Sequence, residues 1–311
     1  MLSLRLPQDK PLEQFENMPL FEPVLQTLHP HKRDKYLQFE PKWHKYTITN
    51  DKYSKYTSVT KIVHSMFPQF NPDAVIKKMM AGKNWNESNK YWGMTPDEIK
   101  TQWKTDGEKQ SGAGTSLHED IEAFMNQWLV DEDDNLIHSN HETLFECFME
   151  DTENGDAIVQ NDSEEFTFFL DFVKKNNHLK PYRTEWMIYH EDTKLAGSID
   201  MTYINDDGTI DIYDWKRCKD ITGENSFGEF GISPVTQHLP HCNFWHYSLQ
   251  LNVYKAILED KYGIKVRNLY LVKLHPESVI GSYELIEVAD LQKEVGEIFN
   301  MLKRKQNKTV K

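Results

Sequence analysis

Residues 194–216, KLAGSIDMTYINDDGTIDIYDWK, decide the fold. Two runs rich in Ile, Tyr and Thr are joined by the turn sequence NDDG at 205–208, which predicts a β-hairpin. Because side chains alternate between the faces of a strand, one face of the second run carries Ile210, Ile212, Asp214 and Lys216. Asp200 lies at the matching end of the first run. The hairpin therefore predicts two carboxylates and a lysine at one end of a small sheet, a set suited to a divalent metal ion.

The composition is typical of a globular protein without a membrane span. The 311 residues are 38% hydrophobic, and no run approaches the roughly 18 apolar residues that cross a bilayer. The N-terminus lacks the apolar segment of a secretory signal. Three scattered cysteines are too few for a disulfide framework or a four-cysteine metal cluster. We therefore expect a soluble, intracellular protein with no membrane partner.

The acidic charge is concentrated in one part of the chain. The net charge is -13, but residues 110–173 contain 17 Asp and Glu and no Lys or Arg. The rest of the chain has 36 basic and 32 acidic residues, so its balance is slightly positive. A basic surface that binds DNA is therefore compatible with the overall acidity.

Periodicity and capping signals predict helices and strands in an α/β order. A β-prone segment at 56–60 precedes a helix at 61–67 that Ser58 or Thr60 would cap. Helices are further expected at 71–80, 95–103, 112–128 (capped by Ser116 and Glu119), 143–150, 164–175, 244–261 and 290–303, and strands at 184–190, 268–274 and 282–288. This order predicts an α/β core at 110–300 with an acidic insertion near 131–165, preceded by an N-terminal arm and helical subdomain at 1–109 and followed by a basic tail at 301–311.

Two further side chains can join the hairpin set. Glu185 lies on the preceding strand, and His118 lies on the apolar-striped helix, four residues before Glu122 on the same face. Carboxylates with one imidazole favour Mg²⁺ or Mn²⁺, and a nearby lysine can position a water molecule for phosphodiester hydrolysis. The alternative is a solvated hairpin whose polar residues bind nothing. Asp214 and Lys216 argue against it, because they continue an apolar face and buried charges are usually paired or bound to metal.

The order of these motifs resembles the PD-(D/E)xK nucleases. Residues 197–200 (GSID) and 214–216 (DWK) match the central motif, and two additions match the RecB-type exonuclease branch: GTSLH at 114–118 and QLNVY at 250–254. Residues 56–60 (YTSVT) are also similar to a segment of the mitochondrial genome maintenance exonuclease group and of related phage and large-virus nucleases.

The resemblance implies a restriction-endonuclease-like core, a small mixed sheet flanked by helices, and a metal-dependent DNA exonuclease acting on single-stranded or end-containing DNA. It assigns the metal to His118, Asp200, Asp214 and the Trp215 carbonyl, and catalysis to Lys216 with Asp200, Asp214 and Glu185. Gln250 and Tyr254 would contact DNA or brace Lys216, and Ser58 and Thr60 are added as DNA contacts. Because the cysteines do not fit the family's cluster-binding members, no iron–sulfur cluster is expected.

Alternative functions remain open at this point. A structure-specific endonuclease or a non-catalytic nucleic-acid-binding module would use the same fold. Residues 131–142 match a calcium loop at positions one, three, five and twelve, but Leu136 replaces the glycine that the turn requires. The aromatic residues Trp85, Tyr91, Trp92 and Trp103 could stack on single-stranded bases. A buried aromatic core for the helical subdomain is the favoured interpretation of them.

Overall fold

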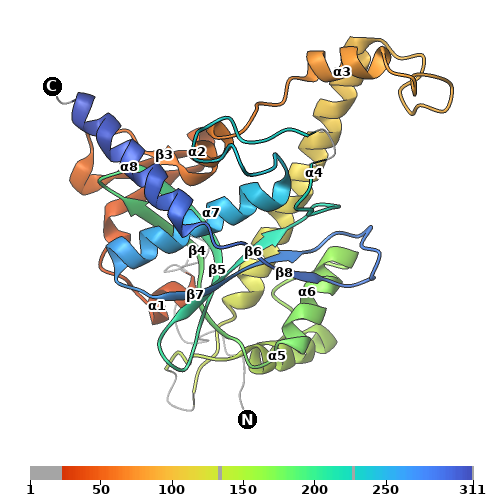
Figure 1. Ribbon diagram of the computed structural model, residues 1–311. Helices are drawn as coiled ribbons and strands as arrows, with labels where there is room; N and C mark the ends of the chain where they lie inside the picture. The colour runs from red at the N-terminus through yellow and green to blue at the C-terminus, as the bar shows by residue number, and fades with distance from the viewer. Residues whose placement is uncertain (1–22, 132–134, 226–227, 310–311) are drawn as a thin grey trace.

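The computed structural model describes residues 23–131, 135–225 and 228–309. It has a central mixed β-sheet covered by helices, so the predicted α/β class is confirmed (Figure 1). The sheet has the order β3-β5-β6-β7-β8, and β4 also pairs with β5. Its strands are β3 (Thr57–Ser58), β4 (Lys180–His190), β5 (Leu195–Ile204), β6 (Ile210–Lys216), β7 (Val266–Lys273) and β8 (Glu284–Glu287). Within the described part of the chain, no helix is long and apolar enough to cross a membrane.

The predicted hairpin is formed by β5 and β6. The two strands pair antiparallel from Ile204 opposite Ile210 to Met201 opposite Tyr213. Gly208 has φ +78° in the turn, a conformation that glycine adopts without steric strain. On the other side of β6, β7 runs parallel to it. The hairpin is therefore central to the sheet, and β6 is buried on both faces.

Helices cover both faces of the sheet. One core contains α2 (Val59–Ser65), α7 (Asn243–Ile257) and α8 (Gln292–Thr309), and it includes Ile210 and Ile212 of β6. The other contains part of α4 (Pro96–Met125), α5 (His141–Asn154) and α6 (Glu164–Lys175), and it includes Tyr213 and Trp215. The alternation predicted for β6 is thus confirmed, because consecutive residues enter opposite cores.

The N-terminal region joins this core rather than standing apart from it. A small sheet of β1 (Leu37–Glu40) and β2 (Lys45–Ile48) packs with Tyr189 and Ala196, and α1 (Val24–Leu28) precedes it. β3 pairs parallel with the start of β5. The domain boundary predicted at residue 109 falls inside α4.

The long helix α4 corrects the prediction of two separate helices. The capping box of Thr95 and Glu98 is confirmed, but the helix continues without a break to Met125. Ser116 and Glu119 therefore lie within the helix, and their predicted capping box is wrong. The physical reason is that both ends of the segment are anchored: Ile99 is buried near the start, and Leu117 and Ile121 enter the main core near the end.

Helix α3 (Pro72–Met80) packs against the first half of α4, and the two extend away from the sheet (Figure 1). The favoured prediction of a buried aromatic core here is wrong. None of Trp85, Tyr91, Trp92 and Trp103 is buried, and Ile76 and Ile99 are the buried residues of the segment 68–111.

The calcium-loop candidate is only partly described, because residues 132–134 lie outside the described residues. Of its other members, Asp131 accepts hydrogen bonds from the backbone and side chain of Asn135, and Glu142 lies in the first turn of α5.

Candidate metal centre

The predicted carboxylates lie where β5 and β6 separate. Regular pairing of the two strands stops at Met201 and Tyr213. Beyond this point the side chain of Asp200 replaces the missing strand contact, since its Oδ2 atom accepts a hydrogen bond of 3.1 Å from the backbone N–H of Trp215. The separation of the strands forms a fork, with Asp200 on β5 and Asp214 on β6.

Helix α4 brings His118 to the fork. Its Nδ1 atom lies 3.7 Å from Oδ2 of Asp200 and 3.7 Å from Oε1 of Glu185, and its Nε2 atom lies 3.1 Å from the Trp215 carbonyl oxygen. One ligand-type atom from each of His118, Glu185 and Asp200 falls within 4.8 Å of the other two. Four predicted groups, including the Trp215 carbonyl, therefore converge from four elements of the fold: α4, β4, β5 and β6.

Glu185 is held at this position by a strained backbone. Its φ of +39° lies in the left-handed region that residues with a side chain rarely adopt. The hydroxyl of Ser198 on the neighbouring strand donates a hydrogen bond of 2.9 Å to its carboxylate. Such strain persists only where surrounding contacts impose it, and it is concentrated at functional sites.

Asp214 and Lys216 form a buried ion pair on the α7 side of the fork. Asp214 is 1% exposed, and its Oδ1 atom is buried without a hydrogen-bond partner. The Lys216 ammonium also lies over the ring of Tyr247 in α7, 4.8 Å from its centroid. Asp214 lies outside the cluster of His118, Glu185 and Asp200, although the sequence assigns it to the same metal.

The electrostatics of the site reflect buried charge. Burial, followed by repulsion from Asp200, raises the pKa of Asp214 to about 6. Burial likewise raises the pKa of Asp200, although His118 and Lys216 oppose the shift. For His118, burial acts to lower the pKa, but Asp200 and Glu185 outweigh it and raise the pKa to about 9. For Lys216, attraction to Asp214 and Asp200 similarly outweighs burial and raises the pKa.

The Gln–Tyr pair of α7 lies against the first strand of the hairpin. The amide of Gln250 donates to the hydroxyl of Tyr254 at 3.4 Å, and the Tyr254 side chain is buried. A methyl group on Gly197 would lie 2.7 Å from a ring carbon of Tyr254, so only glycine fits there. Burial, followed by the charges of Asp200 and Asp214, raises the pKa of Tyr254, and a hydrogen bond with Thr60 opposes this shift. Ser58 caps α2 by accepting from the Lys61 N–H.

Two residues near the fork were not among the predicted site residues. Tyr247 lies three positions before Gln250, and this helical spacing could have identified it. Glu122 lies one turn beyond His118 on α4. Burial, followed by the charges of Glu185 and Glu119, raises the pKa of Glu122 to about 7. Its position beside His118 follows from the helical spacing, but nothing in the local sequence indicates its burial.

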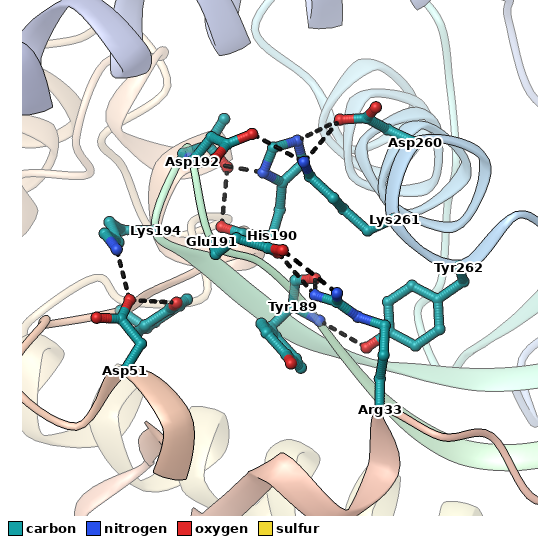
Figure 2. A network of polar contacts seen from close by, with 12 residues as sticks. Arg33, Asp51, Tyr189, His190, Glu191, Asp192, Lys194, Asp260, Lys261 and Tyr262 are labelled. Carbon is teal, nitrogen blue, oxygen red and sulfur yellow. Dashed lines mark hydrogen bonds and ion pairs between the residues drawn. The ribbon is translucent and has the colours of Figure 1, made fainter.

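A second group of ligand-type side chains is a structural network (Figure 2). His190, Asp192 and Asp260 lie close together, but Lys261 forms ion pairs with both aspartates, at 2.8 Å to Asp192 and 3.5 Å to Asp260. Both ring nitrogens of His190 also have protein partners: Asp260 at 2.8 Å and the N–H of Thr193 at 3.4 Å. Lys261 therefore already offsets part of the aspartate charge, and both ring nitrogens of His190 are engaged within the protein.

The same network connects distant parts of the chain. Arg33 packs between the rings of Tyr189 and Tyr262 and makes two hydrogen bonds to Glu191 (Figure 2). It thereby fastens the N-terminal region to β4 and to the π-helical turn Leu258–Tyr262 that follows α7.

The residues at the fork fit a hard divalent cation. The Oδ1 atom of Asp214 is a buried acceptor for which the described residues supply no donor, and buried anionic oxygens are usually paired or bound to metal. Carboxylate and carbonyl oxygens with one imidazole suit Mg²⁺ or Mn²⁺.

In comparisons with known proteins, no family model matches the chain, and no curated protein is significantly similar to it.

Proposed function

We propose that this protein is a metal-dependent DNA exonuclease with a restriction-endonuclease-like core. The observation that carries the proposal is the meeting of His118, Glu185 and Asp200 within 4.8 Å of one another at a strand fork that also holds Lys216. Two of these groups lie on neighbouring strands, and the third comes from a helix on one face of the sheet. Anionic ligands that hold a metal ion, together with a cationic side chain, can catalyse phosphodiester hydrolysis.

The ligands of the proposed metal are His118, Glu185, Asp200 and the Trp215 carbonyl, with Asp214 as a further ligand. When bound, Mg²⁺ or Mn²⁺ would supply a Lewis acid for the phosphoryl oxygen and would lower the pKa of a bound water molecule. His118 must be neutral to act as a ligand, so it would lose the proton that Asp200 and Glu185 favour.

Lys216 is the proposed catalytic cation. Its ammonium group stays protonated beside Asp214, and it would orient the attacking water and stabilise the negative charge that develops on the phosphate. Asp214 and Tyr247 contact the ammonium group from the protein side and restrict its position. Such restriction matters because a small misplacement of a catalytic group lowers the rate strongly.

The proposed substrate is DNA that is single-stranded or has free ends. The proposed place of action is the interior of the cell. Gln250, Ser58 and Thr60 are the proposed DNA contacts near the centre. Tyr254 is buried against Gly197, so its role is to brace the fork from the α7 side. Thr60 is exposed and Gln250 is half-buried, and both remain accessible to a bound strand.

The test is degradation of end-labelled linear DNA and of a circle of the same sequence, with Mg²⁺ or Mn²⁺ and with EDTA. We expect loss of the linear strand from its ends, no cleavage of the circle, and no activity in EDTA. Lys216→Ala should reduce the rate by about 10²-fold or more, the range for removal of one electrostatic catalytic group.

Lys219→Ala is the matched control. Lys219 lies three residues further on, is exposed, and pairs with Glu277 at the surface, so its loss should leave the rate unchanged. Equal activity of Lys216→Ala and wild type would overturn the proposed mechanism. Cleavage of the circle would indicate a structure-specific endonuclease, and metal-independent binding without cleavage would indicate a nucleic-acid-binding module.

A further inference from the structure

The arm formed by residues 68–111, which comprise α3, the segment before it, the loop after it and the first half of α4, has an unusual surface. It extends away from the sheet (Figure 1). It also exposes large aromatic side chains. Phe70 is 69% exposed and Trp92 is 47% exposed. Apolar rings of this size ordinarily fill a core, so an exposed group of them indicates a surface that meets a partner.

The rings are arranged in two touching groups. Trp85 and Trp92 have centroids 5.6 Å apart. Trp103 lies 5.8 Å from Phe70 and 5.9 Å from Tyr91. Each group thus holds its rings against one another while leaving part of their surface open to solvent, which is the form of a stacking platform.

The middle of the arm is basic, whereas the whole protein is acidic. Residues 74–96 contain four lysines and one acidic residue, Glu87, in a chain of net charge -13. The ammonium group of Lys90 lies 4.9 Å from the centroid of Tyr91. Asp73 and Asp97, in the first turns of α3 and α4, both form ion pairs with Lys100, which offsets part of their charge. Lysines among exposed rings complement a polyanion whose bases are unpaired.

Helix α4 fixes the distance between this surface and the candidate metal centre. Trp103 and His118 lie on the same uninterrupted helix, 15 residues apart. At 1.5 Å per residue their separation along the helix axis is about 22 Å. A DNA strand spaces its phosphates about 3.4 Å apart in the stacked form, so this distance corresponds to about six nucleotides.

We propose that this aromatic–lysine arm, defined by Phe70, Trp85, Tyr91, Trp92 and Trp103 with the lysines of residues 74–96, binds unpaired nucleotides of the substrate strand about six nucleotides from the cleaved bond. The inference rests on the proposed nuclease function and adds the reason for a single-strand preference. Duplex DNA hides its base faces, so the rings can stack only on a strand that is unpaired.

The binding test uses the full chain carrying Lys216→Ala, in EDTA, with a fluorescent 20-residue oligothymidylate and a blunt 20-base-pair duplex. Trp92→Ala should weaken binding of the oligothymidylate by about five-fold or more, the lower end for loss of one stacked base. Duplex affinity should change less than two-fold. Trp92→Phe keeps a ring and should restore most of the affinity, which separates stacking from misfolding.

Trp43→Ala is the matched control, since Trp43 is 66% exposed and lies beside Lys42, but outside the arm. It should leave both affinities unchanged. An unchanged affinity of Trp92→Ala for oligothymidylate would overturn the inference. Equal losses of affinity for the duplex and for the single strand would also overturn it. Competition by polyglutamate as strong as that by unlabelled oligothymidylate would overturn it as well, since such competition would indicate an acidic protein partner.

A second measurement separates this inference from the proposed function. Hydrolysis of bis(p-nitrophenyl) phosphate with Mn²⁺ needs only the metal centre, because the molecule is too small to reach the arm. Wild type and Trp92→Ala with an unmodified Lys216 should hydrolyse it equally, while Trp92→Ala degrades long single strands more slowly. If wild type hydrolyses neither substrate, the proposed function fails, while the binding result still decides the role of the arm.

Discussion

Replacement of Tyr247 tests whether the ring under Lys216 contributes to catalysis. The Lys216 side chain is 17% exposed, and its ammonium lies 4.8 Å from the ring centroid. A cation over an aromatic face gains about 0.5–1 kcal/mol when exposed and about 2 kcal/mol when desolvated, and this site lies toward the desolvated end. If the ring holds the ammonium in its reactive position, loss of about 1–2 kcal/mol lowers kcat by about 5- to 30-fold.

The assay is steady-state degradation of end-labelled single-stranded DNA at saturating Mg²⁺. Tyr247→Leu should lower kcat by that factor and leave KM nearly unchanged, because Tyr247 acts through Lys216. Tyr247→Phe keeps the ring and should stay within about two-fold of wild type. Equal impairment of the two variants would refute the reasoning and would assign the effect to the hydroxyl, which contacts Cys218. Wild-type activity of Tyr247→Leu would refute it as well.

Two further predictions concern the stability of the fold. Gly197→Ala should destabilise the protein by about 1–3 kcal/mol in urea unfolding, because the new methyl group would overlap the buried ring of Tyr254. Gly223→Ala, whose methyl group would lie 3.8 Å from Phe244, should change stability by less than about 0.5 kcal/mol, and equal effects of the two substitutions would contradict the packing argument. The second prediction concerns His141, which is fully buried; burial lowers its pKa to about 3. As the pH falls, the unfolded chain therefore takes up a proton at His141 near pH 6.5, before the folded protein does. The free energy of unfolding of the protein consequently decreases as the pH falls from about 6.5 toward 3. Between pH 8 and pH 5 the loss from this residue is about 2 kcal/mol, and the same difference measured for His141→Phe should be smaller by that amount. An unchanged pH dependence in His141→Phe would show that His141 does not titrate as its burial implies.

The sequence predicted the elements that local signals determine. The hairpin follows from alternating residues and a glycine-containing turn, and Ser58, one of the two predicted caps of the helix at 61–67, accepts from the Lys61 N–H in the first turn of α2. Local patterns predict two helices in the segment that forms α4. The residues between them include Gly107, Gly112 and Gly114, and glycine lowers helix propensity by about 1 kcal/mol per residue. Its continuity depends on packing at both ends, which lies too far along the chain for a local pattern to indicate.

The site could be predicted in its residue types but not in its geometry. Asp200, Asp214 and Lys216 share one hairpin, so their proximity follows from strand alternation. The separation of β5 and β6 at the fork cannot be predicted in this way. It depends on contacts from distant parts of the chain, since β3 pairs with the start of β5 and Tyr254 of α7 packs against Gly197. The sequence also gave no indication that Asp214 would pair with Lys216 apart from the cluster around His118.

The charge at the fork explains why the fold and a divalent ion would depend on each other. Four carboxylates, those of Glu122, Glu185, Asp200 and Asp214, face two cationic groups, His118 and Lys216. When all are ionised the balance is -2, and burial, followed by the charge of neighbouring carboxylates, raises the pKa values of Asp214 and Glu122. A cation of charge +2 would remove the repulsion and would favour the neutral imidazole of His118 as a ligand. The strained backbone of Glu185 adds to the same argument, because it holds one of these carboxylates toward the others against their mutual repulsion.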